Sequence, residues 1–316
     1  MTMKSRIVWM LGMVAGIAAC TQEDQRQFSG ENALPVEINS VSVGGETGTR
    51  AFTDITNTTY QLGIIRPNTE GYTYQSTSYF YSDLALGWIS PDPVLVNEHQ
   101  AKLYGYYPYH EASGNYAGLA TGSTFILQAQ PYAESEDVCY GIGKSRVNDY
   151  DYASLIDYRM NFPMKRAYSR LKLALVRSTL YETSKPCQVT KITVKAATDN
   201  NFYNQRPLDI TTGVYTGNTT TGGYTCTVNT SLTTGVETGF DLLLPPQTLS
   251  GGLNVTLLID GVSRPVTISS ITELVAGTYY KVKLTIQDVE VVPQDVAISV
   301  NDYGGQNNVN GGNFDL

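Results

Sequence analysis

The stretch LNVTLLIDGVSRPVTI, residues 253–268, decides the fold class of this protein. Apolar residues fill every second position ahead of the Asp260-Gly261 pair, and they are Leu253, Val255, Leu257 and Ile259. Alternation with a period of two is the pattern of a strand that buries one face. Asp-Gly is a tight-turn pair, and Val266 and Ile268 continue the alternation after it. The stretch therefore predicts a β-hairpin.

The same alternation recurs through the second half of the chain, at Leu171–Leu175, Ile192–Ala196 and Tyr280–Ile286. In the first half we expect short strands at Tyr60–Ile65, Leu103–Tyr109 and Phe125–Leu127, and a hairpin of Tyr72–Tyr74 with Tyr79–Tyr81. Residues 149–160 have the best helix or turn potential there. Strands at roughly 8–12-residue spacing indicate β-sandwiches rather than βαβ units. We predict an all-β protein.

The N-terminus has the composition of an export signal. Lys4 and Arg6 precede an apolar run at residues 7–16, which is shorter than the ~20 residues that span a bilayer. Small residues follow in Ile17-Ala18-Ala19-Cys20. This order predicts a lipoprotein in which residues 1–19 are removed and Cys20 carries the lipid. The alternative is an ordinary cleaved signal in which Cys20 is incidental.

The segment after Cys20 contains a tether, a strand and an exposed loop. Its apolar positions have strand spacing, and they are Leu34, Val36, Ile38, Val41 and Val43. The glycine-rich residues 44–50 follow and end at Arg50; loops of this kind are preferred sites of proteolysis. Length favours two further domains, which we place at residues 51–165 and 166–316.

The end of the chain also has strand character. Its apolar positions are Val289, Val291, Val296, Ile298 and Val300. A strand at a chain end must pair with a sheet edge. Three cysteines remain beyond Cys20, and export permits a disulfide. Cys187 and Cys226 lie in the same half of the chain, so we expect them to pair if any disulfide forms, with Cys139 left over.

Composition excludes several functions. The net charge is −8, and only 16% of the 316 residues are charged, so a nucleic-acid partner is not expected. His99 and His110 have no partner at ligand spacing, and no catalytic or phosphate-binding motif occurs. We expect no enzyme activity, no metal and no cofactor. The sequence has two acidic clusters, at Glu134–Asp137 and Asp149–Asp151, which we interpret as solvated loops. The alternative roles are glycoside hydrolysis and Ca²⁺ binding.

Four local patterns, in chain order, resemble the fimbrillin superfamily, the subunits of type V pili in Gram-negative anaerobes. They are the Ile17–Cys20 signal, LYGYYPY at Leu103–Tyr109, LLPPQ at Leu243–Gln247 ahead of the 253–268 hairpin, and AGTYYKVKLTI at Ala276–Ile286. The resemblance implies two tandem transthyretin-like β-sandwiches. It also implies a lipoprotein of the outer membrane that is cut after Arg50, so that Ala51 becomes the first residue.

In such a subunit the removed strand, Leu34–Val43, leaves an apolar groove, and a tail strand from the next copy fills it. An unpaired edge above an apolar floor is a template for strand addition, and head-to-tail contacts build open filaments. The expected partners are further copies, other pilus subunits and a host or bacterial surface ligand. The alternatives are a pilus tip or anchor, or a glycan-binding lipoprotein that uses the tyrosines of Tyr72–Tyr81.

Overall fold

The computed structural model describes residues 33–44, 53–55, 59–72, 75–83, 85–198, 201–217, 220–221, 223–288 and 291–300. Within these ranges strands are the main secondary structure, and two 3₁₀ turns, η1 (Gly114–Leu119) and η2 (Glu134–Glu136), are the helical elements. None of the described helices has the length and apolar character to cross a membrane. The all-β prediction is confirmed. Cys20, Arg50, Ala51 and Val289 lie outside the described residues.

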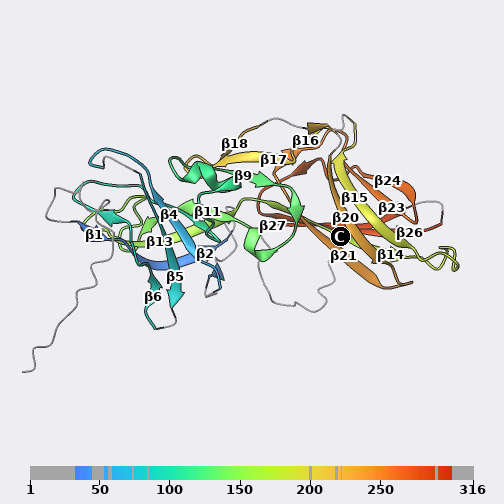
Figure 1. The fold of residues 1–316 in the computed structure, drawn as a ribbon, viewed down its shortest axis with the longest axis horizontal. Helices are drawn as coiled ribbons and strands as arrows, with labels where there is room; N and C mark the ends of the chain where they lie inside the picture. The colour runs from blue at the N-terminus through green and yellow to red at the C-terminus, as the bar shows by residue number, and fades with distance from the viewer. Residues whose placement is uncertain are drawn as a thin grey trace, which may run out of the picture. The chain divides into compact units, whose positions relative to one another are not determined.

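The first half builds one large sheet (Figure 1). In spatial order its strands are β12 (Lys144–Ser145), β13 (Arg159–Arg166), β11 (Cys139–Ile142), β8 (Tyr104–Tyr107), β4 (Leu62–Arg66), β5 (Ser76–Asp83), β6 (Gly87–Ile89), β2 (Glu37–Val43) and β3 (Thr53–Asp54). β2 pairs with β13 as well as with β6, so the sheet closes on itself. A separate short pair joins β1 (Leu34–Pro35) to β7 (Leu95–Val96).

Glycine lets the strands of this sheet lie close to bulky aromatic residues. A Cβ atom at Gly63 in β4 would lie 2.3 Å from the ring of Tyr106, which is fully buried on the neighbouring β8. The predicted hairpin of Tyr72–Tyr74 with Tyr79–Tyr81 is wrong. β5 pairs instead with β4 and β6, and Tyr72 makes an isolated bridge to Thr69. Alternation identified a strand at Tyr79–Tyr81 but not its neighbours.

Two sheets of the second half share one core. One sheet has the order β10 (Gln130–Pro131), β21 (Glu237–Leu244), β14 (Ser169–Arg177), β26 (Thr278–Ile286) and β27 (Val291–Val300). The other has the order β20 (Tyr224–Ser231), β15 (Gln188–Ala196), β23 (Leu253–Ile259) and β24 (Val262–Ile268). Leu171 and Leu173 of β14 share a buried cluster with Val255 and Leu257 of β23. The alternating side chains of both sheets therefore fill the space between them.

The predicted hairpin of residues 253–268 is present in this core. β23 and β24 pair from Leu253↔Ile268 to Ile259↔Val262, and their inward residues alternate as predicted. Asp260 and Gly261 form the turn with φ of 48° and 79°. Both values lie in the left-handed region that two-residue hairpin turns require and that Asp and Gly tolerate.

Short strands connect the two halves. β9 (Thr124–Gln128) pairs with β17 (Gln205–Asp209), and β17 also pairs with β18 (Val214–Tyr215). β10 joins the sheet of β21. Two further short pairs are β16 (Asn201–Phe202) with β19 (Thr220–Thr221), and β22 (Gln247–Thr248) with β25 (Glu273–Leu274). A second buried cluster contains Tyr106 and Tyr140 from the first half and Leu208 and Leu243 from the second.

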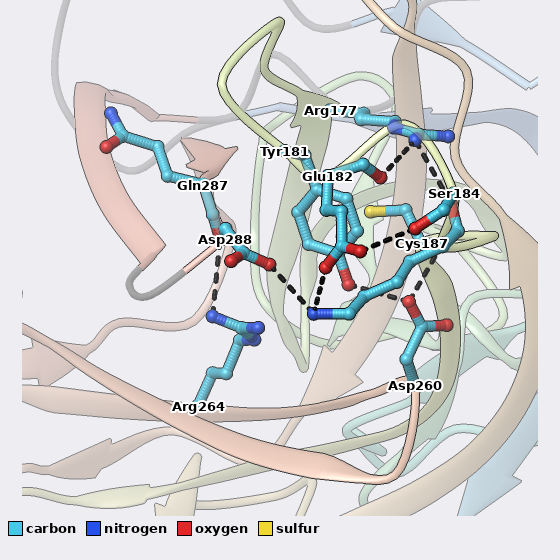
Figure 2. A network of polar contacts seen from close by, with 10 residues as sticks. Arg177, Tyr181, Glu182, Ser184, Cys187, Asp260, Arg264, Gln287 and Asp288 are labelled. Carbon is cyan, nitrogen blue, oxygen red and sulfur yellow. Dashed lines mark hydrogen bonds and ion pairs between the residues drawn. The ribbon is translucent and has the colours of Figure 1, made fainter.

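A polar network closes the end of the second-half sheets at which β14 finishes (Figure 2). The Arg177 side chain donates to the carbonyl oxygens of Glu182 and Lys185, both at 3.0 Å. Lys185 Nζ lies 2.6 Å from a Glu182 carboxylate oxygen and 3.2 Å from one of Asp288. Arg264 donates to the carbonyl of Gln287 at 3.2 Å. The network therefore fixes the end of β26 to the β14–β15 connection and to β24.

Asp260 is the main acceptor of this network. Its carboxylate accepts from the Tyr181 hydroxyl at 2.7 Å and from the backbone N–H groups of Cys187 and Gln188 at 3.0 and 2.8 Å. Burial acts to raise the pKa of the Asp260 carboxyl, but these hydrogen bonds to the charged form outweigh it and hold the pKa below its ordinary value.

The cysteine pairing is wrong in this structure, because Cys187 and Cys226 are both buried as free thiols, as is Cys139. Cys226 lies opposite Ile192 on β15, whereas Cys187 precedes the first residue of that strand. From Gln188, the first residue of β15, to Ile192 the strand rises about 13 Å, and a disulfide needs Cα atoms within about 7 Å. Burial raises the pKa of the Cys187 thiol to about 11.

We predict that Asp260→Asn lowers the free energy of unfolding by about 1–3 kcal/mol at pH 7, because an amide nitrogen cannot accept these hydrogen bonds. Asn tolerates the same positive φ, so backbone strain stays constant. A carboxyl whose folded pKa is depressed contributes stability above its unfolded pKa of about 3.9, and this is lost as the pH falls through the folded value.

Urea unfolding at pH 7 and at about pH 3 measures both effects. The gap between the variant and the unchanged protein should narrow at the lower pH. Glu182→Gln, at the exposed edge of the same network, is the matched control and should cost less than about 0.5 kcal/mol. Equal stability of Asp260→Asn and the unchanged protein at pH 7 would contradict the role given to Asp260.

Candidate functional site: the groove beneath the first strand

β2 is held in the first-half sheet mainly by one neighbour. It pairs in parallel with β13 from Glu37↔Arg159 to Val43↔Met164. On its other side it meets β6 at the single pair Ile38↔Trp88, and then the two residues of β3. The main-chain groups of β13 on this side would be unpaired without β2. β2 therefore covers a strand edge that would otherwise template pairing.

An irregularity in the middle of this pair explains the spacing of the apolar residues. Ile38 lies opposite Met160 and Ser40 opposite Asn161, so Asn39 is an extra residue. Asn161 Oδ1 accepts from Asn39 Nδ2 at 2.6 Å and from Ser40 Oγ at 2.8 Å. One extra residue shifts the alternation by one position. Ile38 and Val41 can therefore both be buried although three positions separate them.

The apolar residues of the strand that is predicted to be removed differ in how deeply they are buried. Val36, Ile38 and Val41 are 3%, 8% and 1% exposed, whereas Val43 is half-buried and Leu34 is 39% exposed. Leu34 belongs to β1 and pairs with Val96 rather than with the large sheet. Full burial of one such aliphatic side chain contributes roughly 1.5–3 kcal/mol. Three of the five predicted residues therefore supply most of the apolar contact.

β13 lies beside β2 in the same sheet, and its buried side chains form what we call the apolar floor of the groove. Met160, Phe162 and Met164 alternate along it and are essentially unexposed. Gly105 and Gly143 make room for them, since a Cβ at either position would lie 2.7–3.0 Å from the Phe162 ring. Sequence reasoning missed this floor. Its alternating signal was present, but Pro163 and the adjoining turn-like residues 149–160 obscured it.

The two ends of β2 have different surroundings. At its start, the Glu37 N–H donates to the Tyr158 carbonyl at 3.0 Å, and the Arg159 guanidinium lies 2.8 Å from the Glu37 carboxylate. At its end, Gly44 borders a cavity of about 310 Å³. The far wall of this cavity is the turn at Ile210–Gly213, from the second half of the chain. Residues of the second half therefore lie near the end of the groove that is marked by Gly44.

The strand that follows the predicted cleavage loop stays attached to β2. Thr53 and Asp54 pair with Val43 and Ser42, and the Ile55 N–H donates to the Val41 carbonyl at 2.7 Å. Arg50 belongs to the connection between β2 and β3. A cut there would leave β2 attached to the remaining chain by non-covalent contacts alone.

The predicted donor segment lies in its own sheet. β27 pairs antiparallel with β26 from Ile286↔Val291 to Thr278↔Val300, and it is the last strand of the sheet. Val291 is 8% exposed and belongs to the second-half core. Val296, Ile298 and Val300 take part in this backbone pairing. The groove and the donor candidates are therefore separate sites, each filled within one chain.

The other sequence candidates lack a shared site. Among the described residues no cluster of His, Cys, Asp and Glu could hold a metal ion. His110 stacks on Tyr116 at 4.1 Å, and His99 lies 3.9 Å from the Glu98 carboxylate. Asp137 is buried and paired with Arg166, while Asp151 pairs with Lys102 at 3.0 Å. Asp137 and Asp151 thus each have a cationic partner.

The tyrosines of Tyr72–Tyr81 divide between interior and surface. Tyr72 is 2% exposed. Its hydroxyl accepts a hydrogen bond from the Asn97 N–H and donates one to the His99 carbonyl. Tyr79 packs on Tyr109 at 5.4 Å, and Tyr81 is 40% exposed. A sugar-stacking platform needs several rings on one open face. These described tyrosines do not provide one.

Comparison with known proteins identifies the family. The family model described as fimbrillin-like matches residues 38–301, which begin inside β2 and run past the end of β27. The chain belongs to the fimbrillin-like family. Fimbrillins are structural subunits of pili rather than enzymes, so this fimbrillin-like protein belongs to a cell-surface fimbrium. No curated protein sequence matches the chain.

Solved structures share the fold of this fimbrillin-like protein. A crystal structure described as a candidate cell adhesion protein from Bacteroides ovatus has a TM-score of 0.57 at 12% identity, covering 84% of this chain and 97% of its own. A similar protein from Bacteroides uniformis has a TM-score of 0.56 at 14% identity, covering 84% and 99%. At these identities the likeness concerns the fold.

We predict that Val41→Asp destabilises the intact chain by about 3 kcal/mol or more, because the carboxylate would enter the apolar groove unpaired. Leu34→Asp, in the same segment but on an exposed side chain, is the matched control and should cost less than about 1 kcal/mol. Urea unfolding of the two variants tests the difference. Equal costs would show that β2 does not seal a groove.

Proposed function

We propose that this fimbrillin-like protein is a polymerising pilus subunit that assembles by strand exchange. Export as a lipoprotein through Cys20 brings the chain to the outer membrane. Cleavage after Arg50 then makes Ala51 the first residue and lets the β1–β2 segment leave. A strand from another copy takes its place on β13. Two tandem transthyretin-like sandwiches, residues 51–165 and 166–316, form the body of the subunit.

The observation that carries the proposal is the pairing of β2. It is a strand with three buried apolar side chains, it lies on one main neighbour, and its connection to β3 contains Arg50. Removing it leaves β13 with unpaired backbone groups above Met160, Phe162 and Met164. Such an edge binds an extended segment through main-chain hydrogen bonds and alternating pockets.

The sequence of β13 is also consistent with a strand that is an edge strand after β2 has left. Pro163 lies within the strand, opposite Ser42 of β2. Proline lacks a backbone N–H, and inside sheets it is found almost only in edge strands, at strand starts or at bulges. β13 is an interior strand only while β2 is present. Pro163 is therefore at a position typical of an edge strand, which β13 would become when β2 leaves and before another strand binds.

β27 is our candidate for the donated strand. It is an edge strand, so it can leave β26 without breaking a pairing on its other side. It carries Val291, Val296, Ile298 and Val300, and Val289 precedes it. Donation costs the burial of Val291 and the pairing with β26. Equivalent pairing and burial on β13 of the next copy offset that cost.

Two linked measurements test the proposal. N-terminal sequencing of protein from the cell surface should give Ala51, and denaturing electrophoresis without boiling should give a ladder that collapses on heating. Arg50→Ala should keep the lipidated start at Cys20 and abolish the ladder. Arg26→Ala, the matched control in the tether, should leave both results unchanged.

A lipidated start at Cys20 in the unchanged protein, with monomers alone on the gel, would sink the stalk-subunit proposal. That result would favour a pilus anchor, which keeps its lipid. A start at Ala51 without self-polymerisation would favour a pilus tip, which accepts a strand but donates none.

A further inference from the structure

The loop between β12 and β13, residues 146–158, displays apolar side chains on a well-braced backbone. We call it the rim loop. Val147 is 79% exposed, Ile156 is 87% exposed and Tyr150 is 45% exposed. Single exposed apolar residues need no explanation, but three of them in one short loop make that loop a candidate interaction surface.

Hydrogen bonds hold the rim loop in shape. The buried Asp157 carboxylate accepts from Ser145 Oγ at 2.7 Å and from Asn148 Nδ2 at 2.9 Å. Ala153 forms a two-bond bridge with Ala101 at 2.8 and 2.9 Å. The rings of Tyr150 and Tyr152 stack at 5.0 Å. A surface fixed before contact loses less conformational entropy on binding than a mobile one.

The rim loop borders the end of the groove at which β2 begins. Tyr158, its last residue, accepts from the Glu37 N–H where β2 begins. At the opposite end, the cavity beside Gly44 is lined by residues 210–213. A strand that runs in the direction of β2 has its N-terminal end, and the body that precedes it, at the rim loop. A strand that replaces β2 therefore reaches its own subunit past the rim loop. The body of that subunit must then contact the loop.

A second set of exposed apolar residues lies where β27 begins. Leu180, Val236 and Val262 are 69%, 52% and 53% exposed, and we call them the corner patch. Leu180 precedes Tyr181 of the polar network in the sequence, and Val262 follows the Asp260–Gly261 turn. The Gly235 N–H, next to Val236, donates to the Arg177 carbonyl at 3.0 Å.

The polar network ties the base of the donated strand to this corner. Lys185 binds Asp288 and Arg264 binds the Gln287 carbonyl, immediately after β26 ends. If β27 separates from β26, it extends away from the subunit at a point beside the corner patch. The residues that must meet the rim loop of the next copy are then Leu180, Val236 and Val262.

We propose that the rim loop is the surface on which a second copy of this chain docks through its corner patch. This inference rests on the strand exchange proposed above. It adds a body-to-body contact between Val147, Tyr150 and Ile156 of one copy and Leu180, Val236 and Val262 of the other. The contact joins two different surfaces, so it propagates along a filament and does not close a dimer.

The test follows assembly of the purified full chain after an arginine-specific protease has produced the Ala51 start. Unboiled gels sampled over time give the rate at which the ladder forms. Ile156→Asp and Leu180→Asp should each slow it at least tenfold, because a carboxylate at the contact would lose its water. Val214→Asp is the matched control: Val214 is 53% exposed on β18, outside both surfaces, and its ladder should form at the unchanged rate.

A charge pair shows whether the two surfaces face each other. Ile156→Lys combined with Leu180→Asp should assemble at least tenfold faster than Ile156→Asp combined with Leu180→Asp. Thermal melting of the uncleaved chains should be the same for every variant, since the substituted side chains are exposed.

The outcomes separate the two proposals. No ladder from the unchanged protein would overturn strand exchange and the docking contact with it. A normal ladder from the unchanged protein, with Ile156→Asp and Leu180→Asp assembling at the same rate, would overturn the docking contact and leave strand exchange standing. A slowed Ile156→Asp beside an unaffected Leu180→Asp would overturn the pairing with the corner patch.

Discussion

The pairing of β2 with β13 is the contact on which the first-half sheet depends. Backbone N–H and C=O groups in a protein interior are almost always hydrogen-bonded. Leaving one of these groups buried without a partner costs more free energy than a typical hydrogen bond contributes. β13 meets this requirement through a strand that precedes the predicted cut in the chain. Pairing with β2 satisfies these groups in the intact chain. Once β2 has left, the unpaired backbone groups of β13 would favour binding of a replacement strand.

The second half of the protein meets a different requirement. Its two sheets share one core, and its connections at one end are tied by Arg177, Lys185, Asp260 and Arg264. The network fixes the end of β26 while β27 remains an edge strand. A rigid base and a separable strand are the two properties that a donor needs. They occur here on consecutive elements of the chain.

The proposed assembly assigns separate roles to backbone and side chains. Main-chain pairing on β13 would supply a long-lived joint whose strength depends little on side-chain identity, while the floor residues fix the register. A one-residue slip exchanges the two faces of a strand, so Met160, Phe162 and Met164 would select one alignment. The rim loop and the corner patch would set the orientation of one body on the next.

The sequence by itself determined the fold class, because alternation with a period of two is a local property of each strand. Leu253–Ile259 and its return strand were predicted with their turn, and the family pattern followed from segments in chain order. Tertiary structure decided what alternation does not encode. The strand predicted to pair with Tyr79–Tyr81 was wrong, because strand pairing depends on residues that are distant in the sequence. Cys187 and Cys226 share a half of the chain, but the register of β15 keeps them apart. The extra residue at Asn39 and the parallel partner of β2 exist only once both strands are placed, so the groove could be named from sequence but its floor could not.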